Sequence, residues 1–150
     1  METLEETERF LDEKAEELNF AKSMDRNEMY KLLISYGNEL PEFPEELMTE
    51  ENFVKGCTSN VYIHAGLKDE KISYTGKADA MIVKGYLAIL IKALSGLKPE
   101  EVLKSESLIE RFTETTDVKA SLTPSRANAF SNIYRTMKEK AKECAQHPNT

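Results

Sequence analysis

The spacing of apolar residues predicts two helices at the start of the chain. Apolar side chains recur at helical intervals over residues 4–18, among Glu, Asp and Lys, as in a weakly amphipathic helix. A second helix is predicted to begin at Asp25, which can cap it, with Glu28 three positions later as in a capping box. Gly37 and then Pro41 end this helix, and an acidic, proline-broken loop follows.

The middle of the chain changes to a period of two, which predicts strands. From Ser59 onward apolar residues alternate with polar ones, and the apolar set is Val61, Ile63, Ala65 and Leu67. Residues 68–70 form a charged turn, after which Ile72 and Tyr74 continue the alternation as far as Gly76. The pattern therefore predicts an antiparallel pair of strands.

The most apolar segment of the chain predicts a central helix. Asp79 stands where it can cap this helix, and Gly96 stands where a helix commonly ends. Because the segment between them is apolar nearly all round, we expect it at the centre of the fold. Further helices are predicted over residues 99–103, 107–115 and, with Thr123 as the cap, 124–144.

The order of these elements decides the fold class. Two helices, a small antiparallel sheet and then further helices give an α+β fold, not a repeated βαβ unit. A chain of 150 residues with 40% hydrophobic residues can build one domain around a single core. We expect that domain to cover residues 1–150, with a helical N-terminal segment over about residues 1–22 and a core over about residues 25–146.

Charge and composition argue against several classes of partner. The formal net charge of −7 and the pI near 5.0 disfavour nucleic acid. The longest apolar run, residues 80–94, is interrupted by Lys84 and Lys92 and is too polar to span a membrane. The N-terminus is acidic and helical in pattern, unlike a secretory signal, so we expect a cytoplasmic protein without a membrane partner.

The chain contains two cysteines, Cys57 and Cys144, with no CxxC motif and no histidine at ligand spacing. We therefore expect no metal site. In the reducing compartment that a chain without a secretion signal normally occupies, both are predicted to be free thiols. Cys144 lies at the end of the apolar stripe of the last predicted helix, so we expect it to pack there.

Cys57 lies in the stretch VKGCTSNVYI, directly before the first predicted strand. A cysteine in such a place is often no more than a small buried apolar side chain. Its neighbours also favour a reactive thiol, because Gly56 leaves room for another backbone and Lys55 can favour the thiolate. A cysteine hydrolase would need a base, and the two histidines, His64 and His147, are expected on a solvent-facing strand position and in the C-terminal tail. Transfer of a group through the thiol needs no such base, so a carrier fits better.

Three short blocks of the sequence resemble those of the SufE family of sulfur-acceptor proteins. GCTSNVY at residues 56–62 resembles the family's GCxSxVW signature, ADAMIVKG at 78–85 resembles its DAxIVKG, and LTPSRAN at 122–128 is similar to its LxPSR motif. The blocks come in the family's order and spacing, and the resemblance covers roughly residues 32–141. Three blocks in order are far more specific than any one of them alone.

The resemblance implies a SufE/IscU-like α+β fold, with a small antiparallel sheet packed against several helices, and a role in iron–sulfur cluster biogenesis. In that family a pyridoxal-phosphate cysteine desulfurase strips sulfur from free cysteine and holds it as a persulfide. The acceptor's cysteine, here Cys57, would take over this sulfur, stimulate the desulfurase and deliver the sulfur to an iron–sulfur scaffold complex. The expected partners are a SufS-like desulfurase and that scaffold complex, and the pyridoxal phosphate would belong to the desulfurase, with no cofactor on this chain.

The resemblance also implies supporting residues around the thiol. Gly56 and Ser59 would shape the loop, Asp79 would cap the central helix near the docking face, and Arg126 would stabilise negative charge on sulfur or contact the partner. Asp79 and Arg126 have plain structural interpretations too, as a helix cap and a first-turn surface residue. Two other functions stay open: an iron–sulfur scaffold of related fold, which needs several thiolate ligands, and a regulator that binds a desulfurase without using its thiol.

Overall fold

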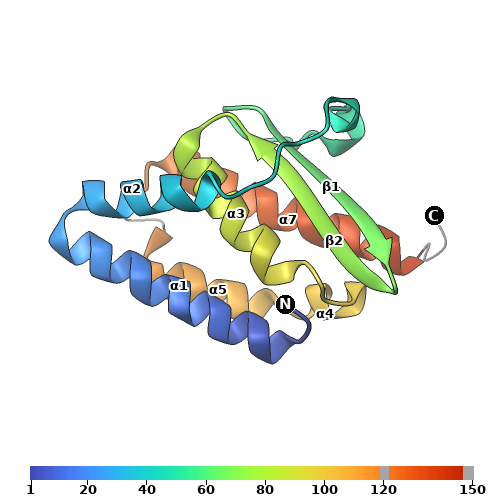
Figure 1. Cartoon of the computed structure of the whole chain (residues 1–150), viewed down its shortest axis with the longest axis horizontal. Helices are drawn as coiled ribbons and strands as arrows, with labels where there is room; N and C mark the ends of the chain where they lie inside the picture. The colour runs from blue at the N-terminus through green and yellow to red at the C-terminus, as the bar shows by residue number, and fades with distance from the viewer. Residues whose placement is uncertain (119–121, 147–150) are drawn as a thin grey trace.

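The computed structural model describes residues 1–118 and 122–146, and its elements follow the predicted order (Figure 1). The helices and strands are α1 (Leu4–Met24), α2 (Arg26–Gly37), β1 (Val61–Lys68), β2 (Lys71–Ala78), α3 (Met81–Leu94), α4 (Pro99–Leu103), α5 (Glu106–Thr116) and α7 (Pro124–Gln146), with two short 3-10 helices, η1 (Glu45–Leu47) and η2 (Glu50–Asn52). A small antiparallel sheet packed against helices confirms the α+β class. None of the helices within these described ranges combines the length and apolar character needed to cross a membrane.

A single residue, Asp25, joins α1 to α2. Its main-chain N–H donates to the Ala21 carbonyl at 3.1 Å and closes α1, while its carboxylate accepts from the N–H of Asn27 at 3.1 Å and caps α2. Because α1 already uses the Asp25 N–H, the predicted capping box with Glu28 does not form. Glu28 pairs instead with Lys31 on the helix surface, at 3.1 Å.

β1 and β2 form the predicted antiparallel hairpin, with β1 beginning at Val61 where the pattern indicated Ser59. The register pairs Val61 with Ala78 at one end and Lys68 with Lys71 at the turn. The second strand therefore runs past the predicted end at Gly76. Alternate residues of β2 are buried, as the period of two predicts, whereas in β1 Val61 and Ile63 are buried and Ala65 and Leu67 are only partly buried.

α3 lies at the centre of the fold and is buried along nearly its whole length, as predicted. Its N-cap, however, is Ala80, which makes no side-chain capping bond, so the predicted cap at Asp79 is wrong. The reason is that β2 continues to Ala78 and the N–H of Asp79 then donates to the Asn60 carbonyl at 3.1 Å. Asp79 consequently belongs to the end of the hairpin, and the helix begins at Met81.

The helices after α3 follow the predictions closely. α4 begins at Pro99, in the first-turn position that proline favours. α7 begins at Pro124, and the Oγ1 atom of Thr123 accepts a hydrogen bond from the N–H of Arg126 at 3.3 Å, so the predicted cap is confirmed. The apolar stripe of α7 packs into the core up to Ala141.

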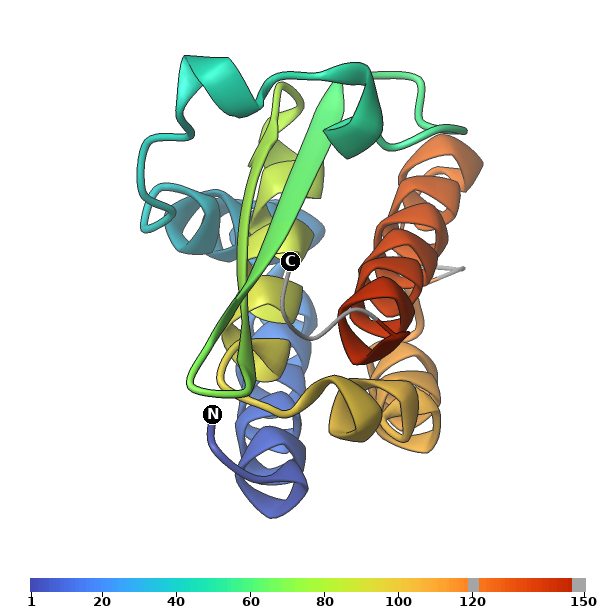
Figure 2. The ribbon, with the colours of Figure 1, turned by 90° about the vertical axis from the view of Figure 1, so that its right-hand side faces the viewer.

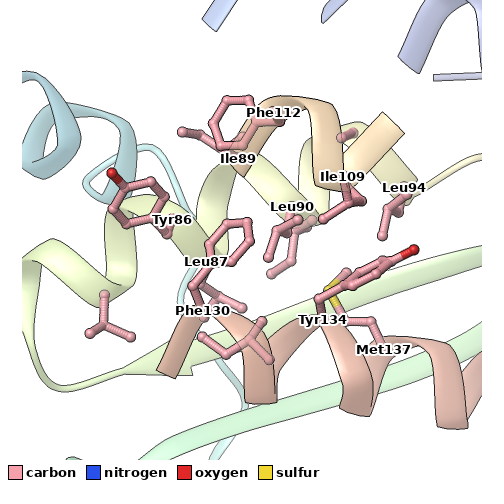
Figure 3. Close-up of a cluster of buried hydrophobic side chains, with 14 of the residues drawn as sticks. Tyr86, Leu87, Ile89, Leu90, Leu94, Ile109, Phe112, Phe130, Tyr134 and Met137 are labelled. Atoms are coloured by element: carbon pink, nitrogen blue, oxygen red, sulfur yellow. The ribbon is translucent and has the colours of Figure 1, made fainter. Parts of the chain in front are cut away.

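The core holds α7 against α3 and α5 (Figure 3). The ring of Phe130 in α7 lies edge-on to Tyr86 of α3, with 5.4 Å between centroids, and stacks on Phe112 of α5 at 6.2 Å. Figure 2 shows the hairpin lying across α3 with α7 alongside. This packing places the N-terminal turns of α7 beside the end of the hairpin where β1 begins.

Candidate functional site

Cys57 lies on a short loop that is closed at both ends. The N–H of Val54 donates to the carbonyl of Val61 at 2.9 Å, and both valines are fully buried. One residue further out, Phe53 and Tyr62 form an isolated antiparallel bridge. Residues 55–60 therefore form a short loop whose two ends are held together by backbone pairing.

The loop is held against α7 by the residues on either side of Cys57. The side-chain amide of Asn132 donates to the Gly56 carbonyl at 3.0 Å, and the hydroxyls of Thr58 and Ser125 are hydrogen bonded at 2.8 Å. Ser125 and Asn132 are seven residues apart, so they lie on one face of the helix. In Figure 2 the segment that leads into β1 reaches the first turns of α7. The residues directly before and after Cys57 are thus both hydrogen bonded to α7.

Only glycine fits the position before the cysteine. Gly56 has φ +89, a conformation that side-chain-bearing residues rarely adopt. A Cβ atom there would lie 2.6 Å from Nδ2 of Asn132, the atom that binds the Gly56 carbonyl. The backbone conformation of Gly56 and its closeness to Asn132 thus set the course of the chain directly before the cysteine.

The thiol of Cys57 is half-buried and packs at the edge of the core. Burial raises the pKa of the Cys57 thiol above its ordinary value, and the positive charge of Arg135 opposes this rise. The net direction is upward, so the resting side chain is the protonated thiol at neutral pH. Lys55, which was expected to favour the thiolate, is exposed, and the charge that acts on the sulfur comes from α7 instead.

The other predicted site residues differ in the contacts that they make around the loop of Cys57. Asp79 binds the carbonyl of Asn60 through its backbone and so sits at the foot of the loop. Arg126 places its guanidinium carbon 5.4 Å from the ring centroid of Tyr30 and links α7 to α2. Its predicted role beside the sulfur stays a prediction, and the positive charge that lowers the pKa of Cys57 is that of Arg135. Ser59 is half-buried within the loop, and its shaping role stays a prediction.

Asn132 and Arg135 are the site residues that the sequence did not reveal. Both lie on the polar side of α7, where the apolar periodicity carries no information. They are three residues apart and share a face of the helix. The one available signal is their position one to two turns after the LTPSRAN block, which is not a signature of any particular chemistry.

Cys144 is remote from Cys57. It lies beside Leu67 and Glu70, at the turn end of the hairpin, whereas Cys57 precedes the other end of β1. An eight-residue strand separates these ends, a length of about 25 Å at the usual rise per residue. Both cysteines are free thiols, as predicted.

The one histidine that the structure describes, His64, does not supply a base for Cys57. His64 lies within β1 opposite Thr75, and its Nε2 approaches the backbone position of Gly66, on the side away from the loop. His147 lies outside the described residues. Within residues 1–118 and 122–146, no three His, Cys, Asp or Glu side chains are grouped so that they could hold a metal ion.

Comparison with known proteins identifies the family. The SufE family, described as an Fe-S metabolism associated domain, matches residues 14–141. An uncharacterized SufE-like protein of Synechocystis is 44% identical over 122 residues, which cover 81% of this chain and 75% of the relative. The cysteine desulfuration protein SufE of Wigglesworthia glossinidia brevipalpis is 30% identical over 125 residues, covering 83% of this chain and 85% of the relative.

Two further matches concern length and fold. SufE-like protein 1, chloroplastic/mitochondrial, of Arabidopsis thaliana is 34% identical over 75% of this chain, but the chain spans only 30% of that relative's length. A solution structure of a hypothetical protein from Thermus thermophilus has the same fold, with a TM-score of 0.68 and 19% identity over 91% of this chain and 96% of that one. With the family match over most of its length, this chain belongs to the SufE family.

Proposed function

We propose that this protein is a sulfur acceptor of iron–sulfur metabolism, in which Cys57 takes sulfur from the persulfide of a cysteine desulfurase. The observation that carries the proposal is the placement of Cys57, whose two neighbours, Gly56 and Thr58, are each bonded to α7. Family membership and the name of the Wigglesworthia relative, cysteine desulfuration protein, support the same reaction class.

The chemistry requires only a thiolate on this chain. The Cys57 thiol loses its proton, and the thiolate attacks the terminal sulfur of the donor persulfide. A new S–S bond forms at Cys57 as the donor's S–S bond breaks, and the donor cysteine leaves as a thiolate. One zero-valent sulfur atom changes hands, so no outside oxidant or reductant is needed. Pyridoxal phosphate, which frees sulfur from cysteine, would reside on the desulfurase.

An iron–sulfur scaffold is the weaker alternative. A cluster needs several thiolate ligands in one place, whereas the chain has two cysteines, at opposite ends of the hairpin. A regulator that ignores its own thiol is a further alternative, for which the loop contacts around Cys57 offer no reason.

The proposed partners are those that membership of the SufE family implies. We propose a SufS-like desulfurase as the donor, an iron–sulfur scaffold complex as the recipient, and the cytoplasm as the place where they meet. Pull-down with tagged protein from a cytoplasmic extract, followed by identification of a pyridoxal-phosphate enzyme in the eluate, tests the first of these. Recovery of no desulfurase from an extract with desulfurase activity would contradict it.

The direct test is non-reducing intact-mass spectrometry after incubation with an active desulfurase and free cysteine. The protein should gain the mass of one or more sulfur atoms, and peptide mapping should place them on Cys57. Cys144→Ser is the matched control and should accept sulfur as the wild type does, while Cys57→Ser should accept none. Stimulation of the desulfurase that persists in full with Cys57→Ser would favour the thiol-independent regulator.

A further inference from the structure

The segment around the thiol is held against α7 at four residues between 51 and 58. Polar side chains make the contacts, and the segment runs antiparallel to the helix. In order along the segment, Lys140 Nζ donates to Glu51 O at 3.3 Å and to Asn52 Oδ1 at 3.0 Å, Asn132 Nδ2 donates to Gly56 O at 3.0 Å, and Ser125 binds Thr58 at 2.8 Å. Side chains of α7 therefore hold the loop in place, and the hydrogen bond from Asn132 to Gly56 is the one next to Cys57.

Arg135 lies on α7 between Asn132 and Lys140 in the sequence. It follows Asn132 by three residues and therefore shares its helical face. Its Nε approaches Oε1 of Glu139 only at 4.0 Å, which is long for a charge-assisted hydrogen bond, and its side chain is 60% exposed. The guanidinium thus keeps hydrogen-bond donors for another anion, and its charge acts on Cys57.

We propose that Asn132 and Arg135 position and charge-balance the sulfur of Cys57. Asn132 keeps the loop closed through the Gly56 carbonyl, and Arg135 offsets the negative charge of the thiolate and of the persulfide that replaces it. The inference rests on the proposed function, because it concerns the same thiol and the same transfer. It assigns the two residues separate effects, one on access to the sulfur and one on its ionisation.

The physical need for both residues follows from the half-burial of the thiol. Burial favours the neutral thiol, whereas attack on a persulfide needs the anion, so a nearby cation lowers the cost of ionisation. The same cation favours the persulfide anion after transfer. Charged side chains on the elements around the loop include Glu51 and Lys55 in the segment itself, Asp79 at the end of the hairpin, and Arg126, Arg135, Glu139 and Lys140 on α7. Of these, Arg135 is the one whose charge shifts the pKa of Cys57.

Access is tested by the rate of alkylation with iodoacetamide in a Cys144→Ser background, so that only Cys57 reports. Asn132→Ala removes the Gly56 contact and should raise the limiting rate at high pH about fivefold, the equivalent of one neutral hydrogen bond. Ser125→Ala, which removes the Thr58 contact, should act in the same direction. Asn128→Ala is the matched control, because it changes the same kind of side chain at an exposed position one turn earlier on α7. If Asn132→Ala and Ser125→Ala were alkylated at the same rate as the control, the proposed role of the α7 contacts in limiting access to Cys57 would be wrong.

Ionisation is tested by the pH profile of the same reaction. Arg135→Gln should move the apparent pKa of Cys57 upward, and Arg135→Lys, which keeps the charge, should restore it toward the wild-type value. Lys142→Gln is the matched control, because it removes one positive charge at an exposed position of the same helix. A general loss of structure would not produce a pKa shift that lysine rescues. Identical profiles for Arg135→Gln and Lys142→Gln would overturn the role of Arg135.

The persulfide itself is tested without a desulfurase, by loading Cys57 with inorganic polysulfide and following the loss of sulfur to glutathione by mass spectrometry. Asn132→Ala should discharge several-fold faster than Asn128→Ala, and equal rates would contradict the inference. Loading by polysulfide separates the reactivity of Cys57 from its exchange of sulfur with a desulfurase. If the wild-type protein accepted sulfur from polysulfide but never from an active desulfurase, the proposed function would be wrong. The effects of the variants on access and on the pKa of Cys57 would still support the roles of Asn132 and Arg135.

Discussion

The hydroxyl of Tyr74 donates a buried hydrogen bond to the main-chain carbonyl of Met137, at 2.7 Å. This bond joins β2 to α7 near the middle of the helix, between the turns that hold the thiol loop and the C-terminal turns. Burial raises the pKa of the Tyr74 hydroxyl, so it stays a donor across the physiological range. The alignment of α7 with the hairpin, and therefore of Asn132 with Gly56, depends on contacts of this kind.

Replacing Tyr74 with Phe should lower the free energy of unfolding by about 1 kcal/mol, because the ring is kept and one buried hydrogen bond is lost. Urea unfolding followed by circular dichroism measures the change. Tyr62→Phe is the matched control, since the Tyr62 ring packs on Phe43 and Phe53 and its hydroxyl has no hydrogen bond among the described residues. Equal midpoints for the two variants would show that the Tyr74 bond adds nothing.

Gly85 allows α2 and α3 to cross closely, and a side chain there should be costly. A Cβ on Gly85 would lie 2.2 Å from the carbonyl oxygen of Leu33 and 2.7 Å from its carbonyl carbon, so backbone must move. Gly85→Ala should therefore lower the free energy of unfolding by about 2 to 3 kcal/mol. Gly66→Ala is the comparison, because its Cβ would meet nothing closer than His64 Nε2 at 3.9 Å. A Gly85→Ala protein as stable as Gly66→Ala would mean that the helices separate at little cost.

Much of the fold could be predicted because hydrophobic periodicity and turn residues determine it locally. The stripe of α7 and its cap at Thr123 follow from residues that are neighbours in sequence or one helical turn apart. Asp79 shows where this reasoning fails. It has the composition of a helix cap, but a backbone bond to Asn60, nineteen positions earlier, extends the hairpin and delays the helix.

The site residues, too, divide into those that could be predicted from the sequence and those that could not. Cys57 and Gly56 could be identified because a family signature surrounds them and because the glycine has a steric role. Asn132 could not be identified, because its contact with Gly56 spans 76 positions and polar residues on a helix surface look alike in sequence. Lys55 and Arg126 were reasonable candidates for the charge near the sulfur, but nearness in sequence or in a motif does not determine where a long side chain points.

The raised pKa of Cys57 predicts a pH dependence of stability as well as of reactivity. The folded chain holds this proton to higher pH than the unfolded chain, which releases it near the ordinary cysteine pKa of about 8.5. The contribution of Cys57 to stability is therefore complete below that pH and is lost as the pH rises through the folded pKa. In a Cys144→Ser background, the free energy of unfolding should fall more steeply between about pH 8 and 10 with Cys57 than with Cys57→Ser. Parallel curves for the two proteins would rule out an ionisation linked to folding.

Arg126 and Arg135 lie on the same helix and should have opposite kinds of effect. The Arg126 guanidinium rests over the Tyr30 ring, so Arg126→Met should lower the free energy of unfolding by about 0.5 to 1 kcal/mol. Because this guanidinium is held on Tyr30 of α2, the pH profile of alkylation should stay at the wild-type position. Arg135→Gln should do the reverse, with a shifted profile and little change in urea midpoint, since its side chain is largely exposed. A shifted profile for Arg126→Met would restore the role that the sequence motif implied, and would place a second positive charge within reach of the sulfur.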